Sequence, residues 1–215
     1  HVMVGVASDN YIGHHMHVSC NNITIVGKGK SKTTILGGFY VNGKQNVKIE
    51  QLSATNAGTG GCGLVCEGSG TNVDVTECCF QKCRSNGMLV REGAIATATR
   101  CEFMENVYGC GVYCRDANTK VRLNDCKMHH NANYGLGANE HAVVDLHGTK
   151  TDIHSNNDNG IFAYGHAKVN IHLPSQHNTS HDNVREDRVQ QFGGSIANIN
   201  ADGTFTHVEE DDDDY

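Results

Sequence analysis

A glycine recurs along this chain at an almost constant interval, and each time an apolar residue follows it. The intervals are 24, 24, 24 and 25 residues, for Gly63, Gly87, Gly111, Gly135 and Gly160. A period in the twenties is typical of a solenoid, in which each unit buries its apolar face only against its neighbours. The sequence therefore predicts a rod of stacked units with a narrow apolar interior.

Inside each unit the pattern has a period of two residues, which indicates strands rather than helices. Short stretches rich in Val, Ile, Thr and Cys are separated by Gly and Asn. Three such stretches per unit predict three short strands per coil, with equivalent strands of successive coils paired in parallel about 4.8 Å apart. We expect an all-β rod of about seven coils of ~24 residues, from Asn22 to Ile199.

The composition fits this architecture. The chain has 25 Gly and 22 Asn but a single Pro and no Trp. Gly and Asn are expected to turn the chain at the corners, because both accept left-handed backbone conformations. Asn repeated at one corner, as at Asn106, Asn131 and Asn156, is expected to pass side-chain hydrogen bonds from coil to coil. Pro would remove a ladder donor, and Trp is too large for a thin core.

Leucine-rich repeats share this period, but the chain has only eight Leu and no unit with helical periodicity. The coil patterns Val121-Arg-Leu-Asn-Asp-Cys126 and Asn131-Ala-Asn-Tyr-Gly135-Leu136 instead resemble the right-handed parallel β-helix family, the pectate-lyase-like group. The resemblance covers nearly the whole chain and implies a single-stranded, right-handed parallel β-helix solenoid. The group includes polysaccharide lyases, alginate epimerases and non-catalytic modules that bind carbohydrate or protein, so the fold alone does not fix a function.

The repeat predicts four segments along the chain. Residues 1–20 form an N-terminal cap or a first partial coil, and residues 21–173 form the β-helix repeats. Residues 174–208 form a C-terminal loop or cap with the final strands, and residues 209–215 form an acidic tail that is expected to be disordered. Uncapped coil ends expose strand edges, so self-association through the ends is a further expectation.

The charge distribution bears on the partners. The formal charge is −7, but the acidic tail holds six of the 24 carboxylates, which leaves 18 against 17 Lys plus Arg. A nearly neutral body argues against nucleic-acid binding, which requires a basic patch. No apolar run approaches the ~18 residues of a membrane span. A glycan or a protein surface is the expected partner.

The cysteines are periodic. Cys78, Cys101 and Cys126 occupy the same inward position in three successive coils. We interpret them as a column of buried thiols that act as small apolar side chains, with disulfides between neighbours as the alternative. The family resemblance leans towards an extracellular or cell-surface location, whereas unpaired cysteine columns are compatible with a reducing compartment, so the compartment stays open.

Several of the 14 histidines also fall into register. His129 and His154 are 25 residues apart, as are His147 and His172. Partners in adjacent coils would stand side by side on the outside of the rod, where two imidazoles would hold Zn²⁺ or Cu²⁺, or repel each other on protonation. The alternative is a solvated polar face.

The third strand of each coil carries the face that is predicted to bind a ligand. Aromatic, guanidinium and carboxylate columns share this surface, and aromatic rings beside hydrogen-bonding charges suit a sugar chain that carries carboxylates. The alternative is a solvated ladder of ion pairs. The candidate residues are Arg91, Glu92, Tyr113, Arg115, Asp116, Asn139, Glu140, Phe162 and Tyr164.

Three functions therefore stand. The first is a non-catalytic β-helix that binds a polysaccharide or a protein along its side. The second is a polyuronate lyase or C5-epimerase that abstracts the proton α to a carboxylate, with Ca²⁺ held by Glu92, Asp116 and Glu140. The catalytic motifs that the resemblance would lead us to expect are missing, since the only proline, Pro174, lies in Leu-Pro-Ser. The third is a structural or assembly rod.

Overall fold

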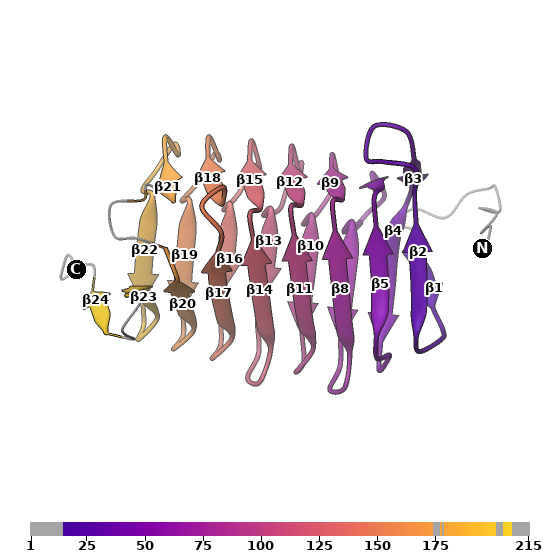
Figure 1. Cartoon of the computed structure of the whole chain (residues 1–215). Helices are drawn as coiled ribbons and strands as arrows, with labels where there is room; N and C mark the ends of the chain where they lie inside the picture. Colours follow the sequence, from indigo (N-terminus) through magenta and orange to yellow (C-terminus); the bar gives the residue numbers. More distant parts are fainter. Residues whose placement is uncertain (1–14, 174–176, 178, 201–203, 208–215) are drawn as a thin grey trace.

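The computed structural model describes residues 15–173, 177, 179–200 and 204–207. The chain winds into a rod of about seven coils, in which each coil contributes one strand to each of three parallel sheets (Figure 1). All regular elements among the described residues are strands. The predicted all-β solenoid of three-stranded coils is confirmed.

Sheet A has eight parallel strands. They are β1 (His15–Val18), β4 (Gly38–Asn42), β7 (Leu64–Glu67), β10 (Met88–Arg91), β13 (Val112–Cys114), β16 (Leu136–Ala138), β19 (Ile161–Tyr164) and β22 (Arg188–Gln191).

Sheet B has nine strands, of which the last, β24, pairs antiparallel with β23. They are β2 (Ile23–Val26), β5 (Val47–Glu50), β8 (Asn72–Thr76), β11 (Ile95–Thr99), β14 (Lys120–Asn124), β17 (Val143–His147), β20 (Lys168–Ile171), β23 (Ser195–Ile199) and β24 (Phe205–His207).

Sheet C has seven strands. They are β3 (Thr34–Leu36), β6 (Ser53–Thr55), β9 (Cys79–Gln81), β12 (Glu102–Met104), β15 (Lys127–His129), β18 (Asp152–His154) and β21 (Ser180–His181). The regular coil therefore continues past residue 173 through β21, β22 and β23, while the division of the chain into caps, repeats and tail stays a prediction.

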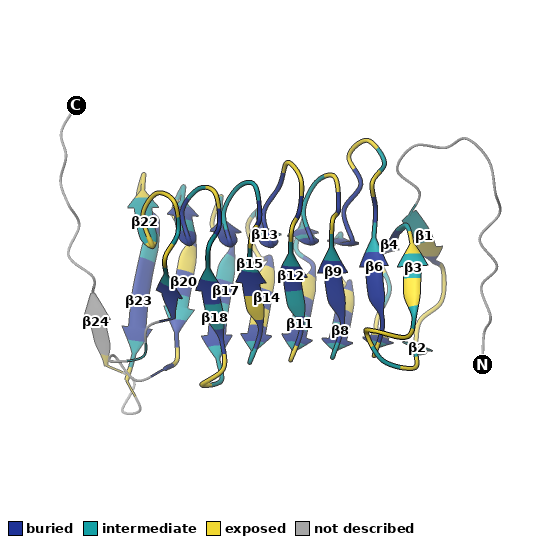
Figure 2. Cartoon of the chain, turned by 90° about the horizontal axis from the view of Figure 1, so that it is seen from above, coloured by how far each residue is buried: buried dark blue, intermediate teal, exposed yellow. Residues whose placement is uncertain are grey.

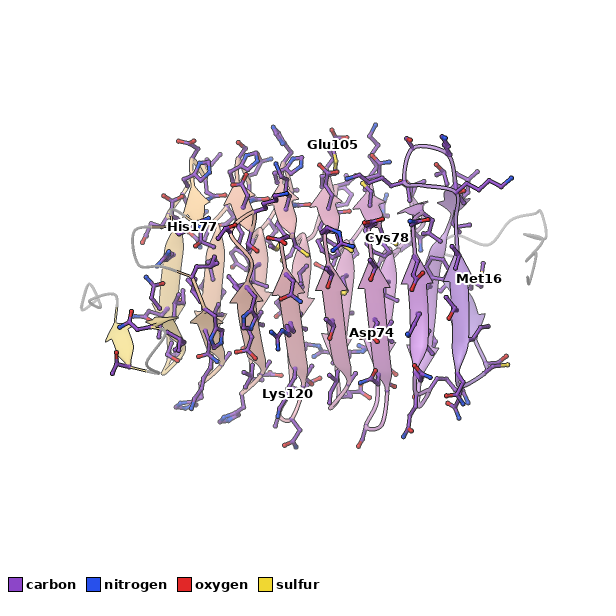
Figure 3. All side chains as sticks on the ribbon, in the orientation of Figure 1. Met16, Asp74, Cys78, Glu105, Lys120 and His177 are labelled. Carbon is purple, nitrogen blue, oxygen red and sulfur yellow. The ribbon has the colours of Figure 1, made fainter. Side chains whose placement is uncertain are left out.

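The core is a narrow apolar column enclosed by the three sheets (Figure 2). Inward positions alternate with outward ones along many strands, as in β14, where Val121 and Leu123 are buried and Lys120, labelled in Figure 3, and Arg122 are exposed. Equivalent core residues stack along the axis. The rings of Phe80 and Phe103, for example, lie 5.5 Å apart at an interplanar angle of 11°.

A buried asparagine ladder runs along the corner between sheets C and A. Asn106 Nδ2 donates to Asn131 Oδ1 at 2.7 Å, and Asn131 Nδ2 donates to Asn156 Oδ1 at 2.9 Å. Asn156 Nδ2 continues the ladder to Asn183 Oδ1 at 2.9 Å. This hydrogen-bonded column is the one that the repeat predicts, and it satisfies buried polar groups that otherwise cost free energy.

The periodic glycines are not the residues that turn the chain. None of the five takes a positive φ, so none is required for a left-handed turn. A Cβ on Gly111 would instead lie 2.7 Å from the carbonyl oxygen of Gly135 in the next coil. The glycine column therefore marks the place where adjacent coils approach most closely, since only a residue without a side chain fits there.

Half of the left-handed positions among the described residues carry charged or polar side chains other than asparagine, and nearly all of the others are Gly or Asn. Glu77, Arg100 and Asp125 follow the sheet B strands with φ of 51–55°. The ladder asparagines come one residue after a left-handed residue, at Glu105, His130 and Ser155. Gly and Asn thus account for only part of the left-handed positions, because a side chain that points into solvent is also tolerated there.

Candidate functional site

The outward column of sheet A has the register that the sequence predicts. Leu89 pairs with Val65 and Tyr113, and Gly137 pairs with Tyr113 and Phe162. The candidate residues of this face are therefore neighbours in space. Their role in binding is a separate question, which the geometry of the side chains addresses.

On the N-terminal part of this face, the guanidinium of Arg91 is already paired with the carboxylate of Glu67. Its Nε donates to Glu67 Oε2 at 2.7 Å, its Nη2 contacts the same oxygen, and Tyr40 donates its hydroxyl to Glu67 Oε1 at 2.8 Å. Burial alone would raise the pKa of Glu67, but the hydrogen bonds from Tyr40 and Arg91 and the charge of Arg91 outweigh it and lower that pKa. Arg91 thus neutralises an internal carboxylate.

The acidic corner column lies between sheets A and B. Glu92, Asp116 and Glu140 all have positive φ, and the backbone N–H of Glu92 donates to Asp116 Oδ2 at 3.1 Å. Arg115 Nη1 is 3.9 Å from Asp116 Oδ1. Within the described part of the chain no group of three or more His, Cys, Asp or Glu side chains is arranged to hold a metal ion. The calcium assignment stays a prediction.

An aromatic strip occupies the C-terminal part of the same face. It consists of Tyr113, Tyr134, Phe162, Tyr164 and Phe192. Tyr134 and Phe162 stack at 4.6 Å, Phe162 and Tyr164 at 6.0 Å, and Tyr164 and Phe192 at 4.9 Å. A row of rings on the outer face of a sheet is a concentrated apolar surface in contact with solvent.

Gly137 makes room for the start of this strip. A Cβ on Gly137 would lie 2.7 Å from Tyr113 Cδ2 and 3.2 Å from Tyr134 Cδ2, so both rings lie against its backbone. Asn139 Nδ2 donates to the Tyr113 hydroxyl at 3.3 Å. Tyr113, Asn139, Phe162 and Tyr164 thus form one continuous surface.

A second surface, the histidine ladder, lies on the outer face of sheet C. His129, His154 and His181 stack with centroids 5.0 and 5.5 Å apart and interplanar angles of 4° and 12°. His129 Nε2 is 3.0 Å from Glu102 Oε1, and His181 Nε2 is 3.0 Å from Asp152 Oδ1. The pairing of His129 with His154 across coils is therefore observed as ring stacking.

The ladder histidines differ in pKa. Hydrogen bonds from His181 to Asp182 and Asp152 raise its pKa above 6.5, whereas burial and the neighbouring histidines lower the pKa of His154 below 6.5 despite the opposing charge of Asp152. The stabilisation from His181 is therefore complete below pH ~6.5 and is lost as pH rises through the raised value. The stabilisation linked to the neutral form of His154 is complete above pH ~6.5 and is lost as pH falls through the lowered pKa of His154.

A titration followed by NMR is expected to show this order directly. The His181 ring protons should titrate above pH ~6.5 and those of His154 below it. Asp182→Asn should lower the pKa of His181, because the Asp182 carboxylate is hydrogen-bonded to the His181 ring, and leave that of His147, on sheet B, unchanged. Equal pKa values for His181 and His154 would contradict the assignment.

The family comparison agrees with this geometry. A protein-family model described as a right-handed β-helix region matches residues 11–183. The chain belongs to the right-handed β-helix family. Neither the search of curated proteins nor that of solved structures returned a match. Membership fixes the fold and its handedness, and it leaves the choice between a binding and a catalytic β-helix to the surface residues.

Two members of the aromatic strip are not among the residues predicted for this β-helix. Tyr134 belongs to the turn before β16, outside the columns from which the candidates were taken. Phe192 follows β22 and continues the corner column of Glu92, Asp116 and Glu140, in a segment that the sequence assigned to the C-terminal loop or cap. The feature of the sequence that could have indicated Tyr134 is Gly137. Because Gly137 has no side chain, it interrupts the outward column and leaves space for a ring from the adjacent turn.

The sheet B histidines stack as the sequence predicts. His147 and His172 lie 4.2 Å apart at 6°, and His172 Nε2 is 3.1 Å from Asp145 Oδ1. Burial, Arg122 and His172 together lower the pKa of His147. Zinc binding at this pair stays a prediction.

All ten cysteines of the β-helix are free thiols, and nine are buried. Cys101 Sγ donates to the carbonyl oxygens of Val75 and Thr99, and Cys126 Sγ donates to those of Ala98 and Asn124. Burial raises the pKa of the Cys110 thiol to about 12. Cys78, Cys101 and Cys126 are free and buried and act as core residues, which confirms the preferred interpretation of the cysteine column.

Among the described residues, none forms a helix of the length and apolarity that crossing a bilayer requires. At the C-terminal end the antiparallel β24 covers the edge strand β23 of sheet B, while β22 and β21 are the last described strands of sheets A and C. Self-association through the coil ends stays a prediction.

Proposed function

We propose that this β-helix binds a polysaccharide along the outer face of sheet A and that the aromatic strip is the centre of the binding surface. The single observation that supports the proposal is the row of five neighbouring rings on one lateral face, with hydrogen-bonding side chains beside it. Apolar ring surface packs against the C–H faces of sugars, and polar groups at its border bond their hydroxyls.

The strip suits an extended ligand. It follows the rod axis from β13 to the residue after β22, which is three strand spacings or roughly 14 Å. A chain of several sugar units that runs parallel to the axis would contact every ring in turn. A small compact ligand would leave most of this surface exposed.

The rings do not contribute equally. Tyr134 and Phe162 cover each other's faces, because their planes differ by only 18°. Phe192 is tilted by 51° to Tyr164 and is 71 % exposed, so it offers the most free ring surface. The side chain of Arg115 is 35 % exposed, and its Nη1 lies 3.9 Å from Asp116 Oδ1. This contact is longer than a hydrogen bond, so the guanidinium keeps N–H donors for a sugar carboxylate.

The test is a glycan array followed by titration of any glycan that binds. Phe192→Ala is expected to weaken binding at least fivefold, which corresponds to about 1 kcal/mol, because the most exposed ring of the strip is lost. The matched control is Tyr108→Ala. Tyr108 is also strongly exposed, but its ring packs against the Arg84 guanidinium and not against the strip.

The proposal is wrong if no glycan binds the intact protein, or if Tyr108→Ala weakens binding as much as Phe192→Ala does. Polyuronates belong in the array, with and without Ca²⁺. Release of unsaturated products from them would identify a lyase and would replace the binding function by the catalytic alternative, for which Glu92, Asp116 and Glu140 would then be the first residues to substitute.

A further inference from the structure

We propose that His129 and His130 form a two-histidine site for Cu²⁺ on the outer edge of sheet C, separate from the aromatic strip. The observation is the distance between two ring nitrogens, since His129 Nδ1 lies 2.8 Å from His130 Nδ1. His130 is exposed, so an ion can reach this pair from solvent.

The backbone explains why two consecutive residues converge. In an extended strand, neighbouring side chains point to opposite faces. β15 ends at His129, and His130 takes a left-handed conformation with φ 56°. The turn therefore directs both rings to the same side. The same corner in the next two coils brings His154 Nδ1 to 3.0 Å from Ser155 Oγ and His181 Nδ1 to 2.8 Å from Asp182 Oδ2, so the arrangement is a property of the repeat.

A carboxylate prepares His129 as a ligand. Glu102 accepts a hydrogen bond from Lys30 Nζ at 2.9 Å and lies 3.0 Å from His129 Nε2. An ionised carboxylate only accepts, so Nε2 carries a hydrogen, and in the metal-binding form of the ring Nδ1 presents the lone pair. Metal-binding histidines are commonly oriented by a carboxylate at the second ring nitrogen in this way.

The distance between the two Nδ1 atoms indicates which metal ion would fit the site. Two nitrogens 2.8 Å apart subtend about 86° at an ion placed ~2.05 Å from each. That is the angle between adjacent ligands in a square-planar or tetragonal complex, which Cu²⁺ and then Ni²⁺ prefer. A tetrahedral Zn²⁺ site would need a separation of about 3.3 Å. Water would complete the coordination, because His129 and His130 are the only two protein ligands that converge here among the described residues.

Binding requires one change of protonation. Without metal, His130 Nδ1 donates its hydrogen to the His129 lone pair. On binding, that hydrogen leaves Nδ1 and His130 is held as the tautomer with its hydrogen on the solvent-facing Nε2, so that both Nδ1 lone pairs face the ion. No electron transfer is involved.

The site differs from the pairs that the sequence predicts. His129 and His154 stack face to face at 5.0 Å, which places their rings parallel and does not aim two lone pairs at one point. His154 Nδ1 is instead directed to Ser155. His154 is therefore the matched control, since it touches His129 without being a ligand.

The experiment is a titration of the full chain with CuCl₂ at neutral pH, followed by calorimetry and electron paramagnetic resonance. His130→Ala is expected to weaken the tightest site at least tenfold and to reduce the nitrogen hyperfine pattern from two imidazoles to one. Glu102→Gln is expected to weaken it about 10- to 100-fold through loss of the orienting carboxylate. His154→Ala should change the affinity by less than threefold.

Two results would overturn the proposal. One is a tightest site that His130→Ala leaves unchanged, and the other is a tightest site that His154→Ala removes. Circular dichroism of each variant shows whether the fold is kept, and His130 is exposed, so its replacement is not expected to affect folding.

Discussion

Asn156→Ala is expected to lower the free energy of unfolding by about 3 kcal/mol, because it removes the central link of a buried hydrogen-bond ladder. Asn156 Oδ1 accepts from the backbone N–H and the Nδ2 of Asn131, and its own Nδ2 donates to the carbonyl oxygens of Met128 and His154 and to Asn183 Oδ1. The side chain is fully buried, so water does not replace these bonds.

For a chain of this length the loss corresponds to a decrease in Tm of about 6–12 °C. The measurement is thermal and urea unfolding followed by circular dichroism. The neighbouring residue supplies the control, since Asn157 is exposed and its side chain has no hydrogen bond to any described residue. Asn157→Ala should change stability by less than about 0.5 kcal/mol. Equal effects of the two substitutions would contradict a structural role for the ladder.

The second large effect is expected at the glycine column. Gly111→Ala should destabilise the protein by about 2–4 kcal/mol, or prevent folding, because the added methyl group meets rigid backbone. The new Cβ would lie 2.7 Å from the carbonyl oxygen of Gly135 and 3.0 Å from Asn131 Nδ2. Relief would require two coils to separate, which would stretch the strand hydrogen bonds and the asparagine ladder together.

Gly60→Asn is the control for this substitution. Gly60 has a positive φ of 69° and open space at the Cβ position, and asparagine accepts that conformation. We expect a change in unfolding free energy below about 1 kcal/mol. If Gly111→Ala were as mild as Gly60→Asn, the close approach of the coils at Gly111 would not be what requires glycine there.

The repeat of 24 residues predicted most of the fold because each coil has the same contacts. The interval between Gly111 and Gly135 fixes which strands pair, and the alternation in Val121-x-Leu123 fixes which side chains face the core. The role of the glycine column was not predicted, because a close approach between coils depends on three-dimensional distance, and in the sequence it looks the same as a glycine that is needed for a turn.

The candidate site was predicted less completely. Columns of strand residues such as Tyr113 and Phe162 follow from the period. Tyr134 enters from a turn, where the period gives no side-chain direction. The convergence of His129 and His130 depends on one left-handed residue at the end of β15, and local sequence does not indicate a positive φ at a histidine.

The uniform register between coils has one more consequence. Each coil presents the same pairing surfaces above and below, and the asparagine ladder passes through the interior coils without a break from Asn106 to Asn183. A whole coil can therefore be added or removed without changing the cross-section of the rod. Gene duplication of about 24 residues would lengthen the lateral surface in fixed increments, and each added coil would also add its own pairing to the stability of the rod, so ligand length and fold stability would change together.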